Sequence, residues 1–263
     1  RSTLFPYTTL FRSVKLPVRT IDLRRRILDR LPEPVSEAPA VGSSLQDVAA
    51  GTVSLDAFIA SLEPEDLAEL AYGDVTMGSP LGVPGNAGAF GGVRARLRAR
   101  GIPAVTTTDG PSGIRVSAFA SLLPCGTALA STWDPALIER MEALHAQEML
   151  RKGSDVLLAP GMNIHRDPLC GRNFEYYSED PLLTGTCAVA YVRGIQSAGV
   201  SACPKHLAAN NQETNRWVHD SRVSARALRE IYLRAFRMVV EEASPRTLMT
   251  SYNKVNGVWS YQT

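Results

Sequence analysis

The sequence has few cysteines and histidines, and neither residue type is spaced as a binding motif requires. The four cysteines form no CxxC pair, so neither a disulfide scaffold nor a zinc site is indicated; they are Cys125, Cys170, Cys187 and Cys203. The histidines show no HxH or HExxH spacing; they are His145, His165, His206 and His219. We therefore predict no metal and no cofactor.

An excess of charge of one sign is also missing. The 28 lysines and arginines nearly balance 26 aspartates and glutamates, which argues against nucleic acid as a partner. No apolar run reaches membrane-spanning length, so we predict a soluble domain without a membrane partner; the oligomeric state stays open. The basic stretch Arg19–Arg30 carries interleaved isoleucines and leucines, which favours a short amphipathic or linker helix. There is no GxSxG elbow, Walker loop or Rossmann fingerprint.

Both ends of the chain look unnatural. Residues Thr3–Ser13, TLFPYTTLFRS, resemble the translation of a DNA-sequencing adapter, so we exclude residues 1–13 as an artefact. The other end, VNGVWSYQT, stops without a helix after a strand-like run. We expect a fragment of a larger protein whose native N-terminus is missing. The compartment stays open, with the cytoplasm slightly favoured.

The first part of the chain is predicted to be a lead-in, residues 14–60. Leu31–Leu55 is rich in Pro, Ser, Ala and Gly, which is typical of a linker. A helix is predicted to start near Glu63 and Pro64, with its apolar residues Leu67, Leu70 and Ala71 facing inward. Residues 78–92 are predicted to form a glycine- and proline-rich surface loop.

Strands and helices are predicted to alternate in the rest of the chain. Strand-like runs occur at residues 104–108, 156–159, 200–203 and 247–251, and helical patterns separate them. Asp134 and Asp180 each precede a proline, as N-caps do, and Gly199 can close the second helix. An apolar stripe from Leu228 to Val240 is interpreted as core. This order predicts an α/β fold with a parallel sheet.

Polar side chains gather where these strands end. Asp109 ends the first strand, Asn163 and His165 follow the second, Lys205 and His206 end the third, and Tyr252 and Asn253 end the fourth. In a (β/α)8 barrel the carboxyl ends of the strands form the active-site face. The segment from Asn163 to Pro181, NIHRDPLCGRNFEYYSEDP, mixes charges with aromatic rings, as a sugar site needs.

Each candidate also has a structural interpretation. Asp109, in DGPSGIR with Arg115 near enough to fold back, could cap a turn or accept hydrogen bonds from sugar hydroxyls. Lys205 and His206 are adjacent, so both face one pocket only if the strand ends or bulges there; otherwise one lies in the core and the other in solvent. The polar run Asn210, Asn211, Gln212 and Glu213 follows them.

Arg172 follows a glycine that allows a ligand to approach the backbone closely. Its guanidinium is a fixed fork suited to a carboxylate or to vicinal hydroxyls, and the alternative is a salt bridge with Glu175 or Glu179. We interpret the remaining polar residues of the segment as supporting or capping residues: Asn163, His165, Glu175 and Asp180.

Four segments, in this order, resemble the catalytic barrel of glycoside hydrolase family 3: DGPSGIR, LLAPGMNIHRDPLCGRNFEYYSEDP, KHLAANNQE and MTSYNKVNG. The resemblance covers Leu97–Gly257. It implies a retaining β-glycosidase, most commonly a β-glucosidase acting on terminal nonreducing β-D-glucosyl residues, with a (β/α)8 TIM-barrel-like domain and an α/β sandwich domain. Its branch of β-N-acetylglucosaminidases carries a KHFPGHG-type run, and LAANNQE after Lys205-His206 argues against that activity.

Residue by residue, the resemblance implies that the pocket surrounds the nonreducing-end sugar, a small-molecule glycoside or oligosaccharide. The matching positions are Asp109, Arg115, Arg172, Lys205 and His206, with Met249 and Tyr252 as further lining residues. β-Xylosidases and arabinosidases occur in the same family, and one hydroxymethyl contact can decide between these sugars. A noncatalytic sugar-binding barrel is the alternative from another class.

The resemblance also implies which catalytic groups to expect elsewhere. Retaining hydrolysis needs two carboxyl groups about 5 to 5.5 Å apart. The family's nucleophile is an aspartate on a strand after the MTSYNKVNG segment, and its acid/base glutamate comes from the other domain, so no residue here is assigned a catalytic role. We expect residues 61–263 to be the N-terminal part of the barrel, truncated after about the first half and inactive alone. Leu45–Gly92 resembles members in which the sandwich domain precedes the barrel.

Overall fold

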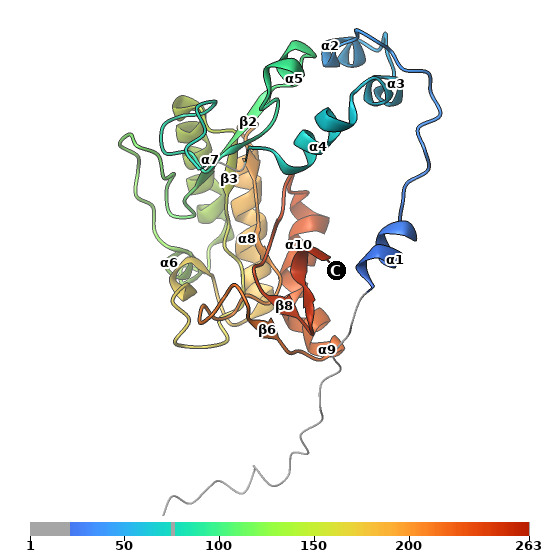
Figure 1. Ribbon diagram of the computed structural model, residues 1–263. Helices are drawn as coiled ribbons and strands as arrows, with labels where there is room; N and C mark the ends of the chain where they lie inside the picture. Colours follow the sequence, from blue (N-terminus) through green and yellow to red (C-terminus); the bar gives the residue numbers. More distant parts are fainter. Residues whose placement is uncertain (1–21, 75–76, 263) are drawn as a thin grey trace, which may run out of the picture.

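The structure is a computed structural model that describes residues 22–74 and 77–262, so the predicted artefact at residues 1–13 lies outside the described residues. In the amino-terminal part the elements are α1 Leu23–Leu28, α2 Leu45–Ala49, α3 Leu55–Ala60, α4 Pro64–Tyr72, β1 Ala89–Gly91 and α5 Ala95–Ala99. Helix α1 lies within the predicted basic helix at residues 19–30. Figure 1 shows α1, α2 and α3 along an extended arm beside the main body, whereas β1 belongs to the main sheet.

The main body alternates strands and helices. Its elements are β2 Ala104–Asp109, α6 Gly126–Ala130, α7 Pro135–Lys152, β3 Val156–Leu158, the 3-10 turn η2 Asn173–Glu175, α8 Pro181–Gln196, β4 Ser201–Ala202, β5 Lys205–Leu207, β6 Asp220–Ser221, α9 Ala225–Ala227, the π-helical turn η3 Leu228–Tyr232, α10 Arg234–Ala243, β7 Met249–Thr250, β8 Lys254–Val255, β9 Val258–Trp259 and the 3-10 turn η4 Ser260–Gln262. The four predicted strands correspond to β2, β3, β4 and β7.

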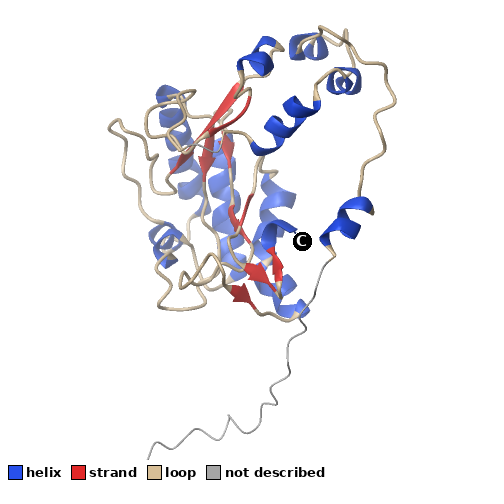
Figure 2. Cartoon of the chain, in the orientation of Figure 1, coloured by secondary structure: helices blue, strands red, loops and turns tan. Residues whose placement is uncertain are grey.

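The strands of the largest sheet lie side by side in the order of the chain. Strand β1 pairs antiparallel with β2, whereas β2, β3 and β4 are parallel neighbours. The chain then continues past Pro204 into β5, where a parallel bridge joins Gly161 to Lys205 and β5 pairs with β7. A separate small sheet holds β6, β8 and β9. The carboxyl end of β2 at Asp109 meets the start of β5 at Lys205, so Lys205 and His206 begin a strand of their own and do not end the predicted strand at residues 200–203. Figure 2 shows the short strands beside the helices of the main body.

Three helices cover one side of these strands. Helix α8 packs between α7 and α10, and Figure 1 shows the three side by side. The core between helices and strands includes Ile138, Met149, Leu157, Tyr191, Ile195, Ala202, Phe236 and Val239. Asp134 and Asp180 accept backbone hydrogen bonds at the starts of α7 and α8, which confirms both predicted N-caps. Helix α8 ends at Gln196, before the predicted closing glycine, Gly199.

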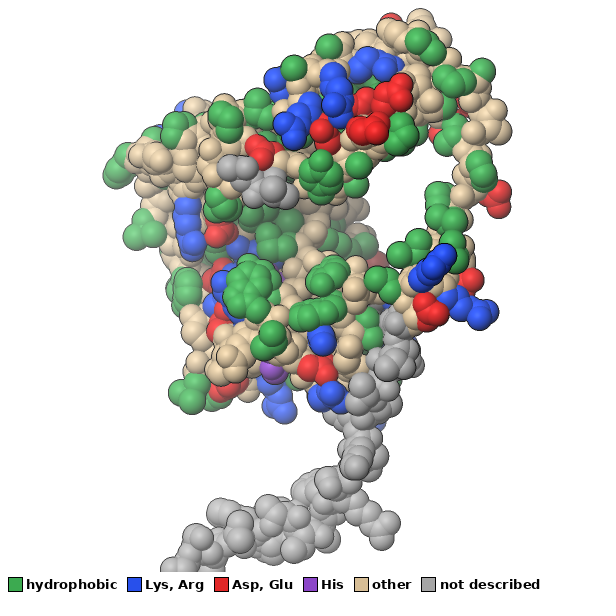
Figure 3. Space-filling model, in the orientation of Figure 1, with side chains coloured by type: hydrophobic (Ala, Val, Ile, Leu, Met, Phe, Trp, Pro, Cys, Tyr) green, Lys and Arg blue, Asp and Glu red, His purple; other side chains and the backbone are tan. Residues whose placement is uncertain are grey.

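The predicted inward face of α4 was wrong. Leu67 and Ala71 are exposed and Leu70 is half-buried, whereas Asp66 and Glu69 are buried. Two arginines explain the rotation: Arg94 at the N-cap of α5 and Arg96 in its first turn pair with these two carboxylates. Figure 3 shows basic and acidic side chains side by side over this region.

Other expectations for the connections also need correction. The predicted linker over residues 31–55 contains α2, whose first turn is closed by a capping box between Ser44 and Asp47. The predicted loop over residues 78–92 ends in β1. The predicted apolar stripe from residue 228 to 240 is interrupted by the π-helical turn η3, which shifts the helical phase and leaves Ile231 and Val240 exposed.

Candidate functional site

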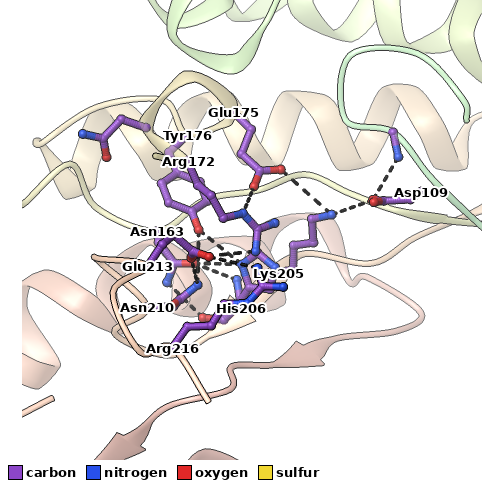
Figure 4. Close-up of polar contacts among 12 residues, drawn as sticks. Asp109, Asn163, Arg172, Glu175, Tyr176, Lys205, His206, Asn210, Glu213 and Arg216 are labelled. Atoms are coloured by element: carbon purple, nitrogen blue, oxygen red, sulfur yellow. Dashed lines mark hydrogen bonds and ion pairs between the residues drawn. The ribbon is translucent and has the colours of Figure 1, made fainter. Parts of the chain in front are cut away.

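The end of β2 is joined to β5 by an ion pair. The Lys205 ammonium lies 2.8 Å from Asp109 Oδ1, and Arg115 Nη1 lies 3.2 Å from Oδ2 of the same carboxylate. Lys205 is almost completely buried, with 3% of its side chain exposed, whereas 35% of the Asp109 side chain remains open to solvent. Burial would raise the pKa of Asp109, but Lys205, Arg115 and the Gly110 backbone N–H hold it below its usual value. An ionised and partly exposed carboxylate thus lies at this edge, and Figure 4 shows it in contact with Lys205.

Lys205 and His206 are both buried, so the interpretation that places one of them in solvent was wrong. The pairing of β5 with β7 shifts register between Lys205 and Leu207, which is the irregularity that two adjacent inward side chains require. Met249 faces Lys205 across this pair and is half-buried. The structure therefore places Lys205, His206 and Met249 together.

Arg172 forms the ion pair that its structural interpretation predicted. Its Nε donates to Glu175 Oε1, and the other oxygen of Glu175 lies 4.0 Å from Lys205 Nζ. Arg172 Nη1 also lies 4.0 Å from Glu213 Oε1. Three cations and three carboxylates thus alternate from Arg115 to Glu213, and Figure 4 shows Arg172 and Lys205 approaching Glu175.

His206 is held by hydrogen bonds to Asn163 and Tyr176. Asn163 Oδ1 accepts from the His206 backbone N–H at 2.9 Å, and Asn163 Nδ2 donates to the His206 carbonyl at 2.9 Å. The Tyr176 hydroxyl is 3.4 Å from His206 Nδ1. Burial, followed by the charges of Arg172, Lys205 and Arg216, lowers the pKa of His206 to about 2. The imidazole is therefore neutral at ordinary pH.

Tyr252 forms a second, aromatic side of the site. Its ring stacks on the His206 ring at 6.3 Å between centroids, and the Trp217 ring lies 4.2 Å away on a tilted plane. The Arg216 guanidinium lies 4.8 Å from the Tyr252 centroid and 5.0 Å from that of Trp217. All seven predicted binding residues are therefore linked to this site by contact or by strand pairing.

The predicted supporting residues have the structural contacts expected of them. His165 Nε2 lies 2.8 Å from the Asn173 carbonyl oxygen, and Asp180 caps α8. The sequence reasoning missed Arg216 and Trp217. Arg216 pairs with Glu213 at 2.9 Å, and Glu213 accepts from Asn210 at 3.1 Å. The signal that could have found them is a cation beside a tryptophan, NRW, which follows the polar run after Thr214.

The residues that the structure describes hold neither a metal-binding cluster nor a membrane-spanning helix. Among residues 22–74 and 77–262, no group of three or more His, Cys, Asp or Glu side chains could hold a metal ion. Within the same ranges, no helix has both the length and the apolar character needed to cross a membrane.

Parallel strands and covering helices define an α/β domain, and a cluster of charged and aromatic side chains lies where β2, β5 and β7 meet. The sequence of the domain also identifies its family. Residues 62–260 match the model of the glycosyl hydrolase family 3 N terminal domain, and the chain belongs to this family.

Relatives and solved structures agree with this assignment. A β-glucosidase of Ruminococcus albus is 49% identical over 93% of this chain and 26% of its own length. An exo-α-(1→6)-L-arabinopyranosidase of Bifidobacterium longum is 46% identical over 63% of this chain and 24% of its own length. The structure of a β-glucosidase from Paenibacillus barengoltzii has a TM-score of 0.87 and 52% identity, covering 93% of this chain and 27% of that one.

A further solved structure contains a sugar. It is β-glucosidase 3B from Thermotoga neapolitana in complex with α-D-glucose, with a TM-score of 0.64 and 49% identity over 68% of this chain and 26% of that one. The chain thus spans about a quarter of the length of the curated relatives it matches.

Proposed function

We propose that this chain supplies the sugar-binding part of a retaining β-glycosidase that acts on terminal nonreducing β-D-glucosyl residues. The observation that carries the proposal is the Asp109 carboxylate, kept ionised by Lys205 and Arg115 while a third of its side chain stays open. An ionised carboxylate at the mouth of a pocket can accept two hydrogen bonds from vicinal hydroxyls, and such charge-assisted bonds are roughly twice as strong as neutral ones. The Thermotoga relative that binds glucose supports this choice of ligand.

The other residues have complementary roles in this proposal. Lys205, Arg172 and Arg115 supply donors for hydroxyl oxygens, and neutral His206 can donate or accept through its ring nitrogens. Met249 and Tyr252 supply apolar surface for the C–H face of the ring. The charged groups are already paired within the protein, so they are held in place before a sugar binds. This preorganisation is what makes the site specific.

The covalent chemistry is assigned to other parts of the full-length enzyme. Asp109 is held by two cations, and Glu175 is bound to Arg172 and lies 4.0 Å from Lys205. A nucleophile or acid/base must instead be free to bond to carbon or to exchange a proton. We propose that residues 61–263 form the first half of a (β/α)8 barrel, that both catalytic carboxyls come from outside this chain, and that this chain alone is inactive.

Calorimetric titration of the 263-residue chain with glucose tests the binding role. We expect saturable binding that Asp109→Asn weakens at least tenfold, because the substitution removes the charge that strengthens both hydrogen bonds. Asp134→Asn is the matched control, since this aspartate makes its side-chain hydrogen bond to Leu137 N at the start of α7. Unchanged glucose affinity in Asp109→Asn would contradict the proposal, and turnover of nitrophenyl-β-glucoside by the purified chain would refute the inactive role.

A pentose-specific enzyme is the second candidate, and the arabinopyranosidase relative favours it. Titration with xylose and arabinose beside glucose separates the two, because a glucose site gains affinity from the hydroxymethyl group that both pentopyranoses lack. A noncatalytic sugar-binding barrel is the third. A full-length protein that binds glucose but hydrolyses no glycoside in a panel of aryl glycosides would establish it.

A further inference from the structure

Trp217 is a large aromatic residue held in place although most of it faces solvent. The residue is 61% exposed, yet the Tyr252 ring lies 4.2 Å from its centroid and the Arg216 guanidinium 5.0 Å from it. The free energy of folding does not require such an arrangement, because an indole with this exposure gains little from burial. An ordered, open aromatic surface is instead typical of recognition.

Its neighbours connect this surface to the proposed pocket. Arg216, which contacts both Tyr252 and Trp217, is held by Glu213 at 2.9 Å, and Glu213 lies 4.0 Å from Arg172. The guanidinium therefore cannot swing away without breaking an ion pair. This lowers the entropy that a ligand must remove when it stacks on the ring.

Exposure rises along the aromatic series from His206 through Tyr252 to Trp217. His206 is buried, Tyr252 beside it is half-buried, and Trp217 beside Tyr252 is exposed. A sugar bound against His206 and Tyr252 would therefore have Trp217 at the outer side of the site. The group bonded to that sugar would meet an indole face.

We propose that Trp217 is the stacking platform for the second pyranose ring of a β-linked disaccharide, and so a specificity-determining residue for the leaving-group side of the substrate. The proposal rests on the proposed function, because the first ring must occupy the pocket around Asp109. The C–H face of a pyranose is flat and apolar, which suits an indole, while its hydroxyls remain in solvent at the edge.

The test compares one ring with two. Glucose and thiocellobiose, a disaccharide whose sulfur link resists hydrolysis, are titrated into the 263-residue chain and its Trp217→Ala variant. We expect the substitution to weaken thiocellobiose binding by about three- to tenfold, the range of an aromatic contact, and to change glucose binding by less than about twofold. Trp217→Phe should restore most of the loss, because it keeps an aromatic face.

Trp133→Ala is the matched control. Trp133 is also a tryptophan, is 74% exposed, and lies between α6 and α7. Equal thiocellobiose affinity in wild type and Trp217→Ala, with glucose still bound, would overturn the platform alone. Failure of the wild-type chain to bind either sugar, with native circular dichroism, would overturn the proposed function and the platform with it.

Discussion

The Lys205 ammonium lies 2.8 Å from the Asp109 carboxylate, joining the ends of two strands that are 96 positions apart in the sequence. The ammonium is buried and the carboxylate is not, so the lysine depends on this partner more than the aspartate does. Glu175, 4.0 Å away, is the second carboxylate near the ammonium. The pair therefore has two consequences, one for stability and one for binding.

Replacing the lysine should expose both consequences. In Lys205→Met, Asp109 keeps Arg115 and the Gly110 N–H as partners, and Glu175 loses a nearby cation. We expect the free energy of unfolding to fall by about 2 to 3 kcal/mol, less than for a fully buried pair because Asp109 is partly solvated. Urea unfolding measures this change.

The double variant Asp109→Asn with Lys205→Met serves as the control, because it removes both charges. It should be more stable than Lys205→Met alone, since the carboxylate left without its ammonium is gone. A double variant that loses the sum of both single effects would show that the two groups do not interact. Glucose affinity should fall in all three variants.

His206 predicts a pH dependence of stability. In the unfolded chain this imidazole takes up a proton near pH 6.5, whereas the folded protein holds its pKa at about 2 because of burial and nearby cations. The unfolded state therefore binds more protons between these values, and stability must fall as the pH falls from about 6.5 towards 2. The loss due to this group approaches about 1.4 kcal/mol per pH unit. Asp109 adds a loss only below its ordinary value of 3.8.

Urea unfolding at several pH values between 7 and 4.5 measures this slope. His206→Asn removes the titrating ring, so its stability should depend less steeply on pH than that of wild type. In wild type, the NMR signal of the His206 ring proton should not move over the same interval. A ring that titrates near pH 6.5 in the folded protein would contradict the prediction.

Replacing either of two glycines of α8 by alanine should destabilise the protein, but by different amounts. An added Cβ at Gly194 would lie 2.5 Å from the Glu139 carbonyl oxygen and 2.7 Å from Glu142 Cβ, both on α7. At Gly185 it would meet the Sδ of Met238 at 2.5 Å, and this flexible side chain can turn away. We expect Gly194→Ala to destabilise by about 2 to 3 kcal/mol and Gly185→Ala by about 1 kcal/mol or less. Thermal unfolding ranks the variants, and equal costs would show that α7 shifts freely.

Much of the strand order could be predicted because the strands and caps carry local signals. Four apolar runs and two Asp-Pro caps lie within single segments of the sequence, and the structure has them at the predicted places. The positions of polar residues at strand ends followed from that order. The resemblance to a family then gathered Asp109, Lys205 and His206 into one site.

The remaining features depend on partners distant in sequence. The buried face of α4 is acidic because Arg94 and Arg96 lie opposite it. The sequence of residues 64–72 alone does not indicate that these arginines will be its partners. The bulge that turns both Lys205 and His206 inward depends on pairing with β7. The role proposed for Trp217 depends on its contact with Tyr252, which lies on a later segment of the chain.

Arg172 is the residue for which a structural and a binding role must be separated. Its ion pair with Glu175 is present, so the structural role alone would predict that a variant loses stability and keeps its affinity for sugar. Arg172→Lys keeps the positive charge but replaces a planar fork of donors with a single ammonium. If two of these donors bind sugar hydroxyls, glucose affinity should fall about tenfold, while the free energy of unfolding falls by only about 1 kcal/mol.

Glu175→Gln tests the pair from its other side, because it removes the charge but keeps an oxygen that can accept from Arg172. It should lower stability by a similar amount and reduce glucose affinity less than Arg172→Lys does. Equal glucose affinity in Arg172→Lys and wild type, measured by calorimetry, would leave the salt bridge as the whole role of this arginine.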